Sequence, residues 1–521
     1  MTKSIKAAAV KVFPMTAVRK IRLVFLSAAM VWWLMPVGAA PVLVVSPATL
    51  TAQAQAGNSP GTQQVAVSNA GNGALKWTVT QPASPAWFNV SPTKGVNTGT
   101  LTVSFTTSTL AIGSYQSSFK VTTSTSSATV TVSLTITSAP SPPPPSGRGP
   151  QAVACPAGAT TIAPTQNMVT IVNGAATGTT FCVLAGTQTL TAPVNLKAGQ
   201  RLIGQQGAII DGTNVVQGFD AGSTAILRVW NCGIDCSGGL IQNLVIKNLA
   251  AYNCVGIVGA GSDNWVIDHN EIYGCAYGTN IGPNNGVQLT NNIIHNNTTA
   301  GYGGNAPLTP LMDNNEFYNN GSIQKWLTTT NAIVRDNYFH NEMVGMWFDG
   351  DNTGALIENN LFEDVSGEAI FYEVSEYATI RNNTIRRSGS HGIFVSTSNN
   401  VESYGNLLED NFRGIQYFLN CGVIGVQPYP GSLYHDLANN YAHDNTVRVG
   451  TGGGAYATLM SHTGTCDITP YLNGSKGLRF DVNHYMVPSL SGAYWLWDAG
   501  ALTWTQWQAV PQDVMGTVAL R

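Results

Sequence analysis

Charged side chains are scarce in this chain of 521 residues. Asp, Glu, Lys and Arg make up 10% of the residues, whereas ordinary soluble domains contain about 25%. This scarcity excludes a coiled coil or a solvated helix bundle, because both need faces rich in Glu and Lys. The hydrophobic share of 44% also argues against a largely disordered chain, since disorder requires low hydrophobicity and high net charge.

Acidic residues are absent from the first 150 positions. All 27 Asp and Glu lie in residues 151–521 together with 14 of the 24 Lys and Arg, which gives this part a net charge of −13. A surface of this sign repels phosphate backbones. We therefore expect no nucleic-acid partner.

The apolar run near the start, Leu23–Met35, has 13 residues, which is too few for a transmembrane helix of about 20. It follows six basic residues and precedes Gly38, Ala39 and Ala40. This order is typical of a secretory signal peptide. We predict a signal peptide over residues 1–39 and bacterial export to the periplasm or the exterior, with no membrane span after cleavage.

All eight cysteines lie beyond the predicted signal peptide. An even number in an exported chain indicates disulfides. Neighbours in the sequence suggest four pairs, although spacing does not fix connectivity: Cys155–Cys182, Cys232–Cys236, Cys254–Cys275 and Cys421–Cys466. Zinc is the weaker alternative, because no second Cys pair or nearby His completes a site with Cys232 and Cys236.

Residues 41–137 alternate between apolar and polar side chains in several short runs, of which 128–134 is one. Period-two alternation between turns of Gly, Asn and Pro predicts an antiparallel β-sandwich. We expect Trp77 and Trp87 to lie in or beside its core. The proline-rich residues 138–150 then predict a stiff linker.

One stretch of this segment resembles a known family. The residues Trp87-Phe88-Asn89-Val90-Ser91-Pro92, followed by Leu110 and Tyr115, resemble the BACON family of Ig-like modules. The resemblance implies a domain that accompanies secreted carbohydrate-active enzymes, either as a passive spacer or as a glycan-binding module.

An Asn recurs at a fixed interval in the second half of the chain. It closes short phrases such as Asn359-Asn360 and stands at positions 270, 292, 315, 337, 360, 383 and 406, in steps of 22 or 23 residues. Each period holds two or three short β-rich runs and no helical stretch of ten residues. Three short strands per period predict a right-handed parallel β-helix whose coils stack at about 4.8 Å. We expect the stacked Asn amides to be structural, bonding to the coils above and below.

Residues 240–445 resemble the pectate-lyase-like β-helix superfamily, and residues 155–240 look like opening coils. The end, from Trp504 to Gly516, resembles a closing segment of secreted bacterial β-helix proteins, which implies a cap. The predicted fold class is all-β. A small Ig-like β-sandwich precedes a right-handed parallel β-helix over residues 151–521.

Aligning successive coils sets the direction of their side chains. When Gly345, Ala369, Gly392 and Gly414 are superposed, the next residue of each coil is apolar and points inward, and the one after it points outward. Two outward columns result, Trp347/Phe371/Phe394/Gln416 and Asp349/Glu373/Ser396/Phe418. Two carboxylates thus fall on adjacent coils, with backbones about 4.8 Å apart.

Paired carboxylates at this separation suit a retaining glycoside hydrolase, whose two carboxyl groups lie about 5–5.5 Å apart. Close carboxylates also split their pKa values, which leaves one able to act as an acid. Outward aromatic rings beside them suit stacking on sugar rings. We predict a secreted carbohydrate-active protein with catalytic Asp349 and Glu373 and with substrate-binding Trp347, Phe371, Phe394, Lys325 and His391.

The local sequence of these two coils resembles the β-helical β-xylosidase family. It reads Gly345-Met346-Trp347-Phe348-Asp349 and Phe371-Tyr372-Glu373-Val374. The resemblance implies that Asp349 is the nucleophile and Glu373 the acid/base. The flanking residues depart from that family, so the identity of the sugar does not carry over.

Two other functions remain open. A polysaccharide lyase or epimerase would hold Ca²⁺ on Asp349 and Asp351 with Glu373 nearby, and would use Lys325 or His391 as the base. The charge of −13 disfavours an anionic polymer unless a metal compensates. A non-catalytic glycan-binding or adhesin protein would tolerate replacement of both carboxylates. For the hydrolase we expect no cofactor, a polysaccharide or oligosaccharide partner, and a monomer.

Overall fold

The computed structural model describes residues 40–521, apart from 56–58, 83–86, 108–109, 111–112, 138–146, 216–223, 231–234, 260, 428–433, 452–454 and 499. The predicted signal peptide, most of the predicted linker and Cys232 lie outside the described residues. No helix in the described part is both long and apolar enough to cross a membrane.

The first described domain is a sandwich of two sheets, in which only β2 and β9 pair in parallel. Trp77 and Trp87 are buried in its core, as predicted. The resemblance to BACON modules stays a prediction. The strands, in spatial order, are β1 Leu43–Ser46, β3 Gln63–Asn69, β7 Gly99–Phe105 and β5 Phe88–Ser91, and then β2 Thr49–Gln55, β9 Ser127–Thr137, β8 Gly113–Thr122, β4 Lys76–Thr80 and β6 Lys94–Val96.

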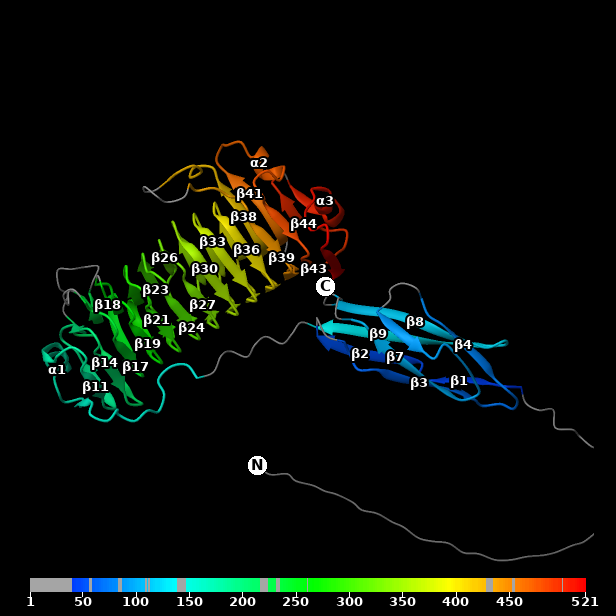
Figure 1. Ribbon diagram of the computed structural model, residues 1–521, viewed down its shortest axis with the longest axis horizontal. Coiled ribbons are helices and arrows are strands. Elements are labelled where there is room, and N and C mark those ends of the chain that lie inside the picture. Colours follow the sequence, from blue (N-terminus) through cyan, green and yellow to red (C-terminus); the bar gives the residue numbers. More distant parts are fainter. Residues whose placement is uncertain are drawn as a thin grey trace, which may run out of the picture.

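The remainder is a parallel β-helix, as predicted. Its coils follow one another in chain order, from those beside helix α1 (Met168–Gly174) to those beside helix α3 (Trp504–Ala509), as Figure 1 shows. A short helix α2, Thr469–Leu472, lies between late coils. Most coils contribute one short strand, usually of three to six residues, to each of three sheets, and within these strands inward apolar residues alternate with outward ones.

Sheet 1 runs along the whole solenoid. Its strands are β10 Thr160–Ile162, β11 Thr180–Val183, β14 Arg201–Gly204, β17 Leu240–Gln242, β19 Val266–Asp268, β21 Gln288–Thr290, β24 Leu311–Asp313, β27 Ile333–Arg335, β30 Thr353–Glu358, β33 Glu376–Arg381, β36 Asn399–Tyr404, β39 Tyr441–His443 and β42 Arg479–Asp481.

Sheets 2 and 3 share two long strands, β18 Val245–Ile257 and β20 Glu271–Ile281, which pair with both rows. The other strands of sheet 2 are β12 Gly186–Thr189, β15 Ala208–Asp211, β22 Ile293–His295, β25 Glu316–Tyr318, β28 Tyr338–His340, β31 Leu361–Glu363, β34 Thr384–Arg386, β37 Leu407–Glu409, β40 Thr446–Arg448, β43 His484–Val487 and β46 Thr517–Leu520. Those of sheet 3 are β13 Val194–Asn195, β16 Ala225–Val229, β23 Ala300–Asn305, β26 Lys325–Leu327, β29 Met346–Asp349, β32 Ile370–Glu373, β35 His391–Ser396, β38 Arg413–Asn420, β41 Tyr456–Thr463, β44 Ala493–Trp497 and the antiparallel β45 Ala501–Thr503.

The repeated Asn phrase forms the turn between sheets 1 and 2. Its first residue is left-handed, with φ of 56° at Asn359, a conformation that Asn tolerates better than most residues. Its second residue is buried and stacked. The Oδ1 atom of Asn360 accepts from the backbone N and the Nδ2 of Asn337, both at 3.0 Å, while Nδ2 of Asn360 donates to the carbonyl of Val334 at 2.9 Å. Each amide therefore satisfies polar groups of the buried turn, which confirms the structural role.

The Asn column extends further than its sequence period indicates. Asn406 donates to Asn445, Asn445 to Asn483 and Asn483 to Asp513, at 2.8–3.0 Å. Asp513 also accepts from Tyr485 Oη at 2.7 Å and from the indole N–H of Trp507 at 2.8 Å. Asp513 thus ends the column where the C-terminal helix closes the solenoid.

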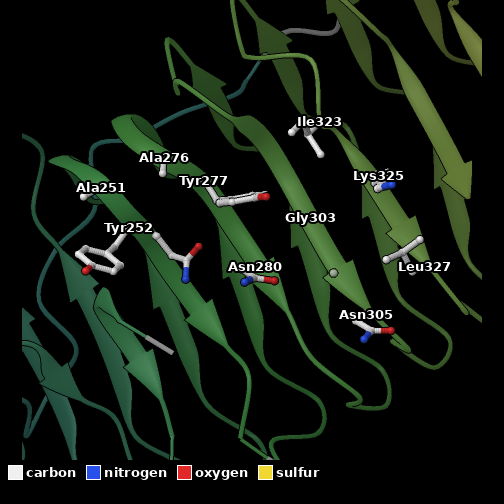
Figure 2. A pocket seen from close by; sticks show the side chains of 12 residues that line it. Ala251, Tyr252, Ala276, Tyr277, Asn280, Gly303, Asn305, Ile323, Lys325 and Leu327 are labelled. Carbon is white, nitrogen blue, oxygen red and sulfur yellow. The ribbon is translucent and has the colours of Figure 1, made fainter. Parts of the chain in front are cut away.

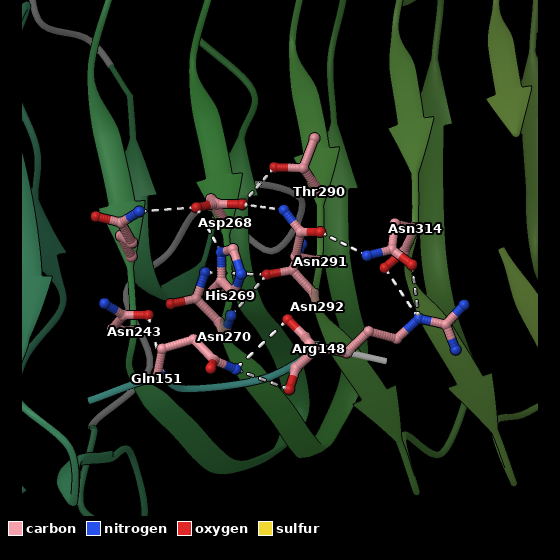
Figure 3. Close-up of polar contacts among 12 residues, drawn as sticks. Arg148, Gln151, Asn243, Asp268, His269, Asn270, Thr290, Asn291, Asn292 and Asn314 are labelled. Atoms are coloured by element: carbon pink, nitrogen blue, oxygen red, sulfur yellow. Dashed lines mark hydrogen bonds and ion pairs between the residues drawn. The ribbon is translucent and has the colours of Figure 1, made fainter. Parts of the chain in front are cut away.

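The segment before the first coil packs on the same turn. The guanidinium of Arg148 donates to the carbonyls of Asn314 at 3.0 Å and Asp336 at 3.1 Å, and Gly149 N donates to Asn291 O at 2.8 Å. Figure 3 shows Arg148 and Gln151 lying along the coils of the Asn column. These contacts span three coils, because successive turns present their carbonyls in a row.

Three of the expected disulfides are confirmed. They join Cys155 to Cys182, Cys254 to Cys275 and Cys421 to Cys466. Cys236 is disulfide-bonded, and its pairing with Cys232 stays a prediction. Disulfides are consistent with an oxidising compartment and therefore with export.

A second column, between sheets 2 and 3, contains a buried acid where an amide stands in the preceding coils. Glu342 is 1% exposed and accepts from Asn320 Nδ2 at 2.7 Å and from Gln324 Nε2 at 2.8 Å. Burial raises the pKa of Glu342 to about 8, although the hydrogen bonds from Asn320 and Gln324 act to lower it. Because the folded-state pKa exceeds the ordinary value, the protonated group stabilises the fold fully below pH of about 4.5, and this stabilisation is lost as the pH rises to about 8.

Replacement of Glu342 by Gln tests this assignment. The variant no longer ionises, so its Tm minus that of the parent should increase steadily from pH 5 to pH 8 and then level off. The measurement is thermal unfolding followed by circular dichroism across this range. Asp467→Asn, at an exposed carboxylate whose pKa is lowered by its hydrogen bonds from Thr469, serves as the control and should give a pH-independent difference. A pH-independent difference for Glu342→Gln would contradict the assignment.

Candidate functional site

Two carboxylates stand directly opposite each other on the outer face of sheet 3. Asp349 ends β29, Glu373 ends β32, and the two are register partners. The apolar residues between the outward positions, such as Phe348 and Tyr372, are fully buried. The predicted alternation and the predicted column are therefore confirmed. Neighbouring parallel strands lie about 4.8 Å apart, so the two acids reach into one space.

This pairing stands alone in the described solenoid. Across the described strand pairs, other acids face basic or uncharged residues, as Glu363 faces Arg386 and Asp313 faces Arg335. Like charges directly opposite each other in a sheet are destabilising. The exception is therefore a feature that folding alone does not favour.

Two side chains of the neighbouring column bind the acids. Lys325 Nζ lies 2.6 Å from Asp349 Oδ2, and the indole N–H of Trp347 donates to Glu373 Oε2 at 3.2 Å. The Lys325 ammonium also lies 4.6 Å from the centre of the Trp347 ring. One cation is thus shared between an acid and an aromatic face, and each carboxylate has a different partner.

These partners give the acids different environments. Burial raises the pKa of Glu373 to about 7, with the negative charge of Asp349 as the second cause. The hydrogen bond from Trp347 and the charge of Lys325 act in the opposite direction. Near neutral pH, Glu373 therefore holds a proton for a substantial fraction of the time and can act as an acid.

The predicted aromatic strip is present. The rings of Trp347 and Phe371 stack with centroids 5.1 Å apart and an interplanar angle of 9°, and Phe394 follows at 4.9 Å. All three side chains are partly exposed, and they follow one another on successive coils. Because neighbouring rings cover one another's faces, they form an apolar row of ring edges beside the carboxylates.

His391 lies beside this strip rather than in the open groove. It is 5% exposed and stacks on Phe394 at 4.4 Å. Its Nε2 lies 2.5 Å from Gln416 Oε1, and its Nδ1 lies 2.8 Å from Ser390 Oγ. Both ring nitrogens thus have protein partners, so the geometry does not favour His391 as a free base.

The residues named for a calcium alternative have separate partners. Asp349 is bound by Lys325, whereas Asp351, beyond the end of β29, lies 3.0 Å from His435 Nε2. Within the described ranges, no three His, Cys, Asp or Glu side chains gather in a group suited to a metal ion. The donor set around Asp349 and Asp351 therefore provides no argument for Ca²⁺.

A pocket of about 360 Å³ adjoins Lys325 on the same sheet face. Figure 2 shows its side chains on successive strands, with Tyr277 and Asn280 on one side and Lys325 on the other. Gly303 lies between them, and a Cβ at this position would come within 3.0 Å of the Tyr277 ring. Glycine therefore leaves room for the ring and hollows the surface.

Sequence reasoning missed the residues of this pocket. The register continues the outward column from Trp347 through Lys325 and Gly303 to Asn280. Extending the coil alignment towards the N-terminus would have found them. The glycine interrupts the pattern, because a column position without a side chain gives no signal of direction.

Comparisons with known proteins agree with the fold. A family model described as a right handed beta helix region matches residues 302–428, the part that carries both carboxylates. The uncharacterized protein YclG of Bacillus subtilis is 26% identical over 254 residues, which are 46% of this chain and 39% of that relative. The chain thus spans about two fifths of the length of the curated relative it matches.

Solved structures with similar folds have low sequence identity. The A-module of Azotobacter vinelandii mannuronan C-5 epimerase AlgE6 is 16% identical with a TM-score of 0.43, and 67% of this chain and 92% of that chain are covered. The periplasmic alginate epimerase AlgG is 12% identical with a TM-score of 0.44, at coverages of 57% and 80%. The DFA-IIIase of Arthrobacter chlorophenolicus A6 is 12% identical with a TM-score of 0.37, at coverages of 64% and 89%.

The contacts of Glu373 predict how its pKa responds to its neighbours. Asp349→Asn should lower the pKa of Glu373, because a nearby negative charge is removed, and Lys325→Met should raise it. The measurement is a carboxyl-carbon NMR titration, with Glu373→Gln to assign the resonance. Lys476→Met, at an ion pair with Asp436, is the matched control. An unchanged pKa in both site variants would contradict the shared groove.

Proposed function

We propose that this protein processes carbohydrates as a retaining glycoside hydrolase, with Asp349 as the nucleophile and Glu373 as the acid/base. The proposal rests chiefly on the direct register pairing of these two acids. A separation near the strand spacing suits attack by one carboxylate on the anomeric carbon, whereas an inverting enzyme needs a gap wide enough for water.

The different environments fit the two roles. In the first step, the Asp349 carboxylate attacks the anomeric carbon, and protonated Glu373 gives its proton to the departing oxygen. In the second step, ionised Glu373 takes a proton from water, which attacks the anomeric carbon and releases Asp349. A pKa near 7 lets one group serve both steps. Lys325 holds Asp349 at 2.6 Å, and Trp347 orients Glu373.

The surroundings favour a substrate that extends along the solenoid axis. The pocket that contains Tyr277 and Asn280 lies on one side of the carboxylates, and the rings of Phe371 and Phe394 continue on the other. Sugar units on both sides of the scissile bond would thus have contacts. We infer an oligosaccharide or polysaccharide substrate.

Replacement of the two acids tests the mechanism. Asp349→Asn and Glu373→Gln should each reduce hydrolysis of an unactivated oligosaccharide by at least about 10³-fold, because nucleophilic and acid catalysis are removed. Reducing-end release from a panel of polysaccharides is the measurement, and NMR of the first product should show the retained anomer. Asp364→Asn, on the same coil as Glu373 and half-exposed, is the control and should keep full activity.

The same panel separates the proposal from its competitors. With an aryl glycoside that has a good leaving group, Glu373→Gln should regain turnover when azide is added, because azide attacks the glycosyl-enzyme without needing a base. Unsaturated uronate products from the parent enzyme would instead identify a lyase. Undiminished turnover by either acid variant would also contradict the assignment.

The pH profile gives an independent check. Because Glu373 must be protonated in the first step, kcat/KM should fall as the pH rises above about 7. In Lys325→Met this alkaline limb should move to higher pH, since the positive charge of Lys325 lowers the pKa of Glu373. A limb that stays in place would contradict the assignment of the acid to Glu373.

A further inference from the structure

A second hollow lies on a different face of the same coils. It is about 520 Å³ in volume and opens on the outer side of sheet 1, across β30, β33 and β36. The residues that matter for its chemistry are Gly354, Tyr377, Arg381, Asn400, Glu402 and Tyr404. Tyr377 belongs to the same coil as Glu373 and follows it by four residues, so the hollow lies around one corner from the carboxylate pair.

Tyr377 is held in an unusual backbone conformation. Its φ is 51°, and it stands in a corner column of left-handed residues that includes Asn331 at 52°, Gly354 at 74° and Asn400 at 56°. Glycine and asparagine adopt this conformation readily, whereas a bulky aromatic residue there is an outlier. The Tyr377 residue is also 52% exposed, so burial does not offset the strain. Strain of this kind is often retained where a side chain has a function.

The polar groups around Tyr377 are fixed and paired. Arg381 forms an ion pair with Glu358 at 2.6 Å and donates to Tyr404 Oη at 3.1 Å. Glu402 lies 3.2 Å from His443 Nε2, and the His443 ring stacks on Tyr404 at 5.1 Å. The hollow therefore has little unpaired charge, while planar amide, guanidinium and carboxylate groups stand beside a free aromatic ring.

We propose that this hollow binds a neutral sugar unit of a polysaccharide, separately from the catalytic groove, with the Tyr377 ring as the stacking surface. A pyranose has an apolar face of C–H groups and a rim of hydroxyls. One exposed ring flanked by Asn400, Glu402 and Arg381 matches that shape, because the ring takes the face and the planar groups take the hydroxyls. The ligand class rests on the proposed function, but the site itself does not.

Two variants separate the ring from the strain. Tyr377→Asn removes the ring and places a residue that suits φ near 51°, so it should raise Tm while it weakens polysaccharide binding about tenfold through lost avidity. Thr309→Asn relieves a left-handed residue of the same column, with φ of 47°, but leaves the ring. It should raise Tm and leave binding unchanged.

Binding is measured on the full chain by affinity electrophoresis in gels that contain each polysaccharide of the panel. For binding, all variants carry Glu373→Gln, so that the polysaccharide is not degraded. In a separate assay with Glu373 intact, kcat/KM on a small aryl glycoside should be the same for the parent and for Tyr377→Asn. Undiminished polysaccharide binding by Tyr377→Asn would overturn the second site, whatever the catalytic result. If no glycoside is hydrolysed by the parent while Tyr377→Asn still weakens binding, the proposed function fails and the second site stands.

Discussion

The in-register stacking of coils is the constraint on which the rest of the structure depends. Each residue of a strand pairs with one residue on the coil before and one on the coil after, at about 4.8 Å. This regularity holds only if every buried turn satisfies its polar groups in the same way. The Asn column does so, because each amide accepts from one coil and donates to the next, as Asn337, Asn360 and Asn383 do.

Strict register has an electrostatic consequence. A substitution in one coil is always placed against the same position of its neighbours, so two acids three strands apart in the chain become direct partners. The repulsion between Asp349 and Glu373 cannot be relieved by a shift of the strand, since a shift would turn the apolar residues outward. It is relieved instead by Lys325 and Trp347 from the adjacent column. Burial and the remaining repulsion from Asp349 raise the pKa of Glu373.

The sequence predicted the features that recur and missed those that interrupt the period. The Asn positions and the outward column of Asp349 could be found because one residue type or one alternation repeats every 22 or 23 residues. Asn445 and Asn483 were not predicted, because insertions lengthen these coils: Asn445 follows Asn406 by 39 residues and Asn483 follows Asn445 by 38. The pocket beside Lys325 was not predicted, because Gly303 in the outward column has no side chain to mark the direction of the strand. The burial of His391 depends on Gln416 on the next coil, which periodicity does not specify.

The distribution of charge over the three faces argues for the location of the chemistry. On sheets 1 and 2, columns of acids and bases alternate: Asp313 pairs with Arg335 on sheet 1, and Glu363 and Glu409 share Arg386 on sheet 2. Such alternation is the arrangement that stacking favours. On sheet 3 two acids face each other directly, with Lys325 bound to Asp349 and Trp347 bound to Glu373, and the coils around them present rings and a hollow. The pairing of Asp349 with Glu373 destabilises the fold, and it lies on the face that has a pocket and aromatic rings to bind a substrate. We therefore infer that the two acids take part in the chemistry.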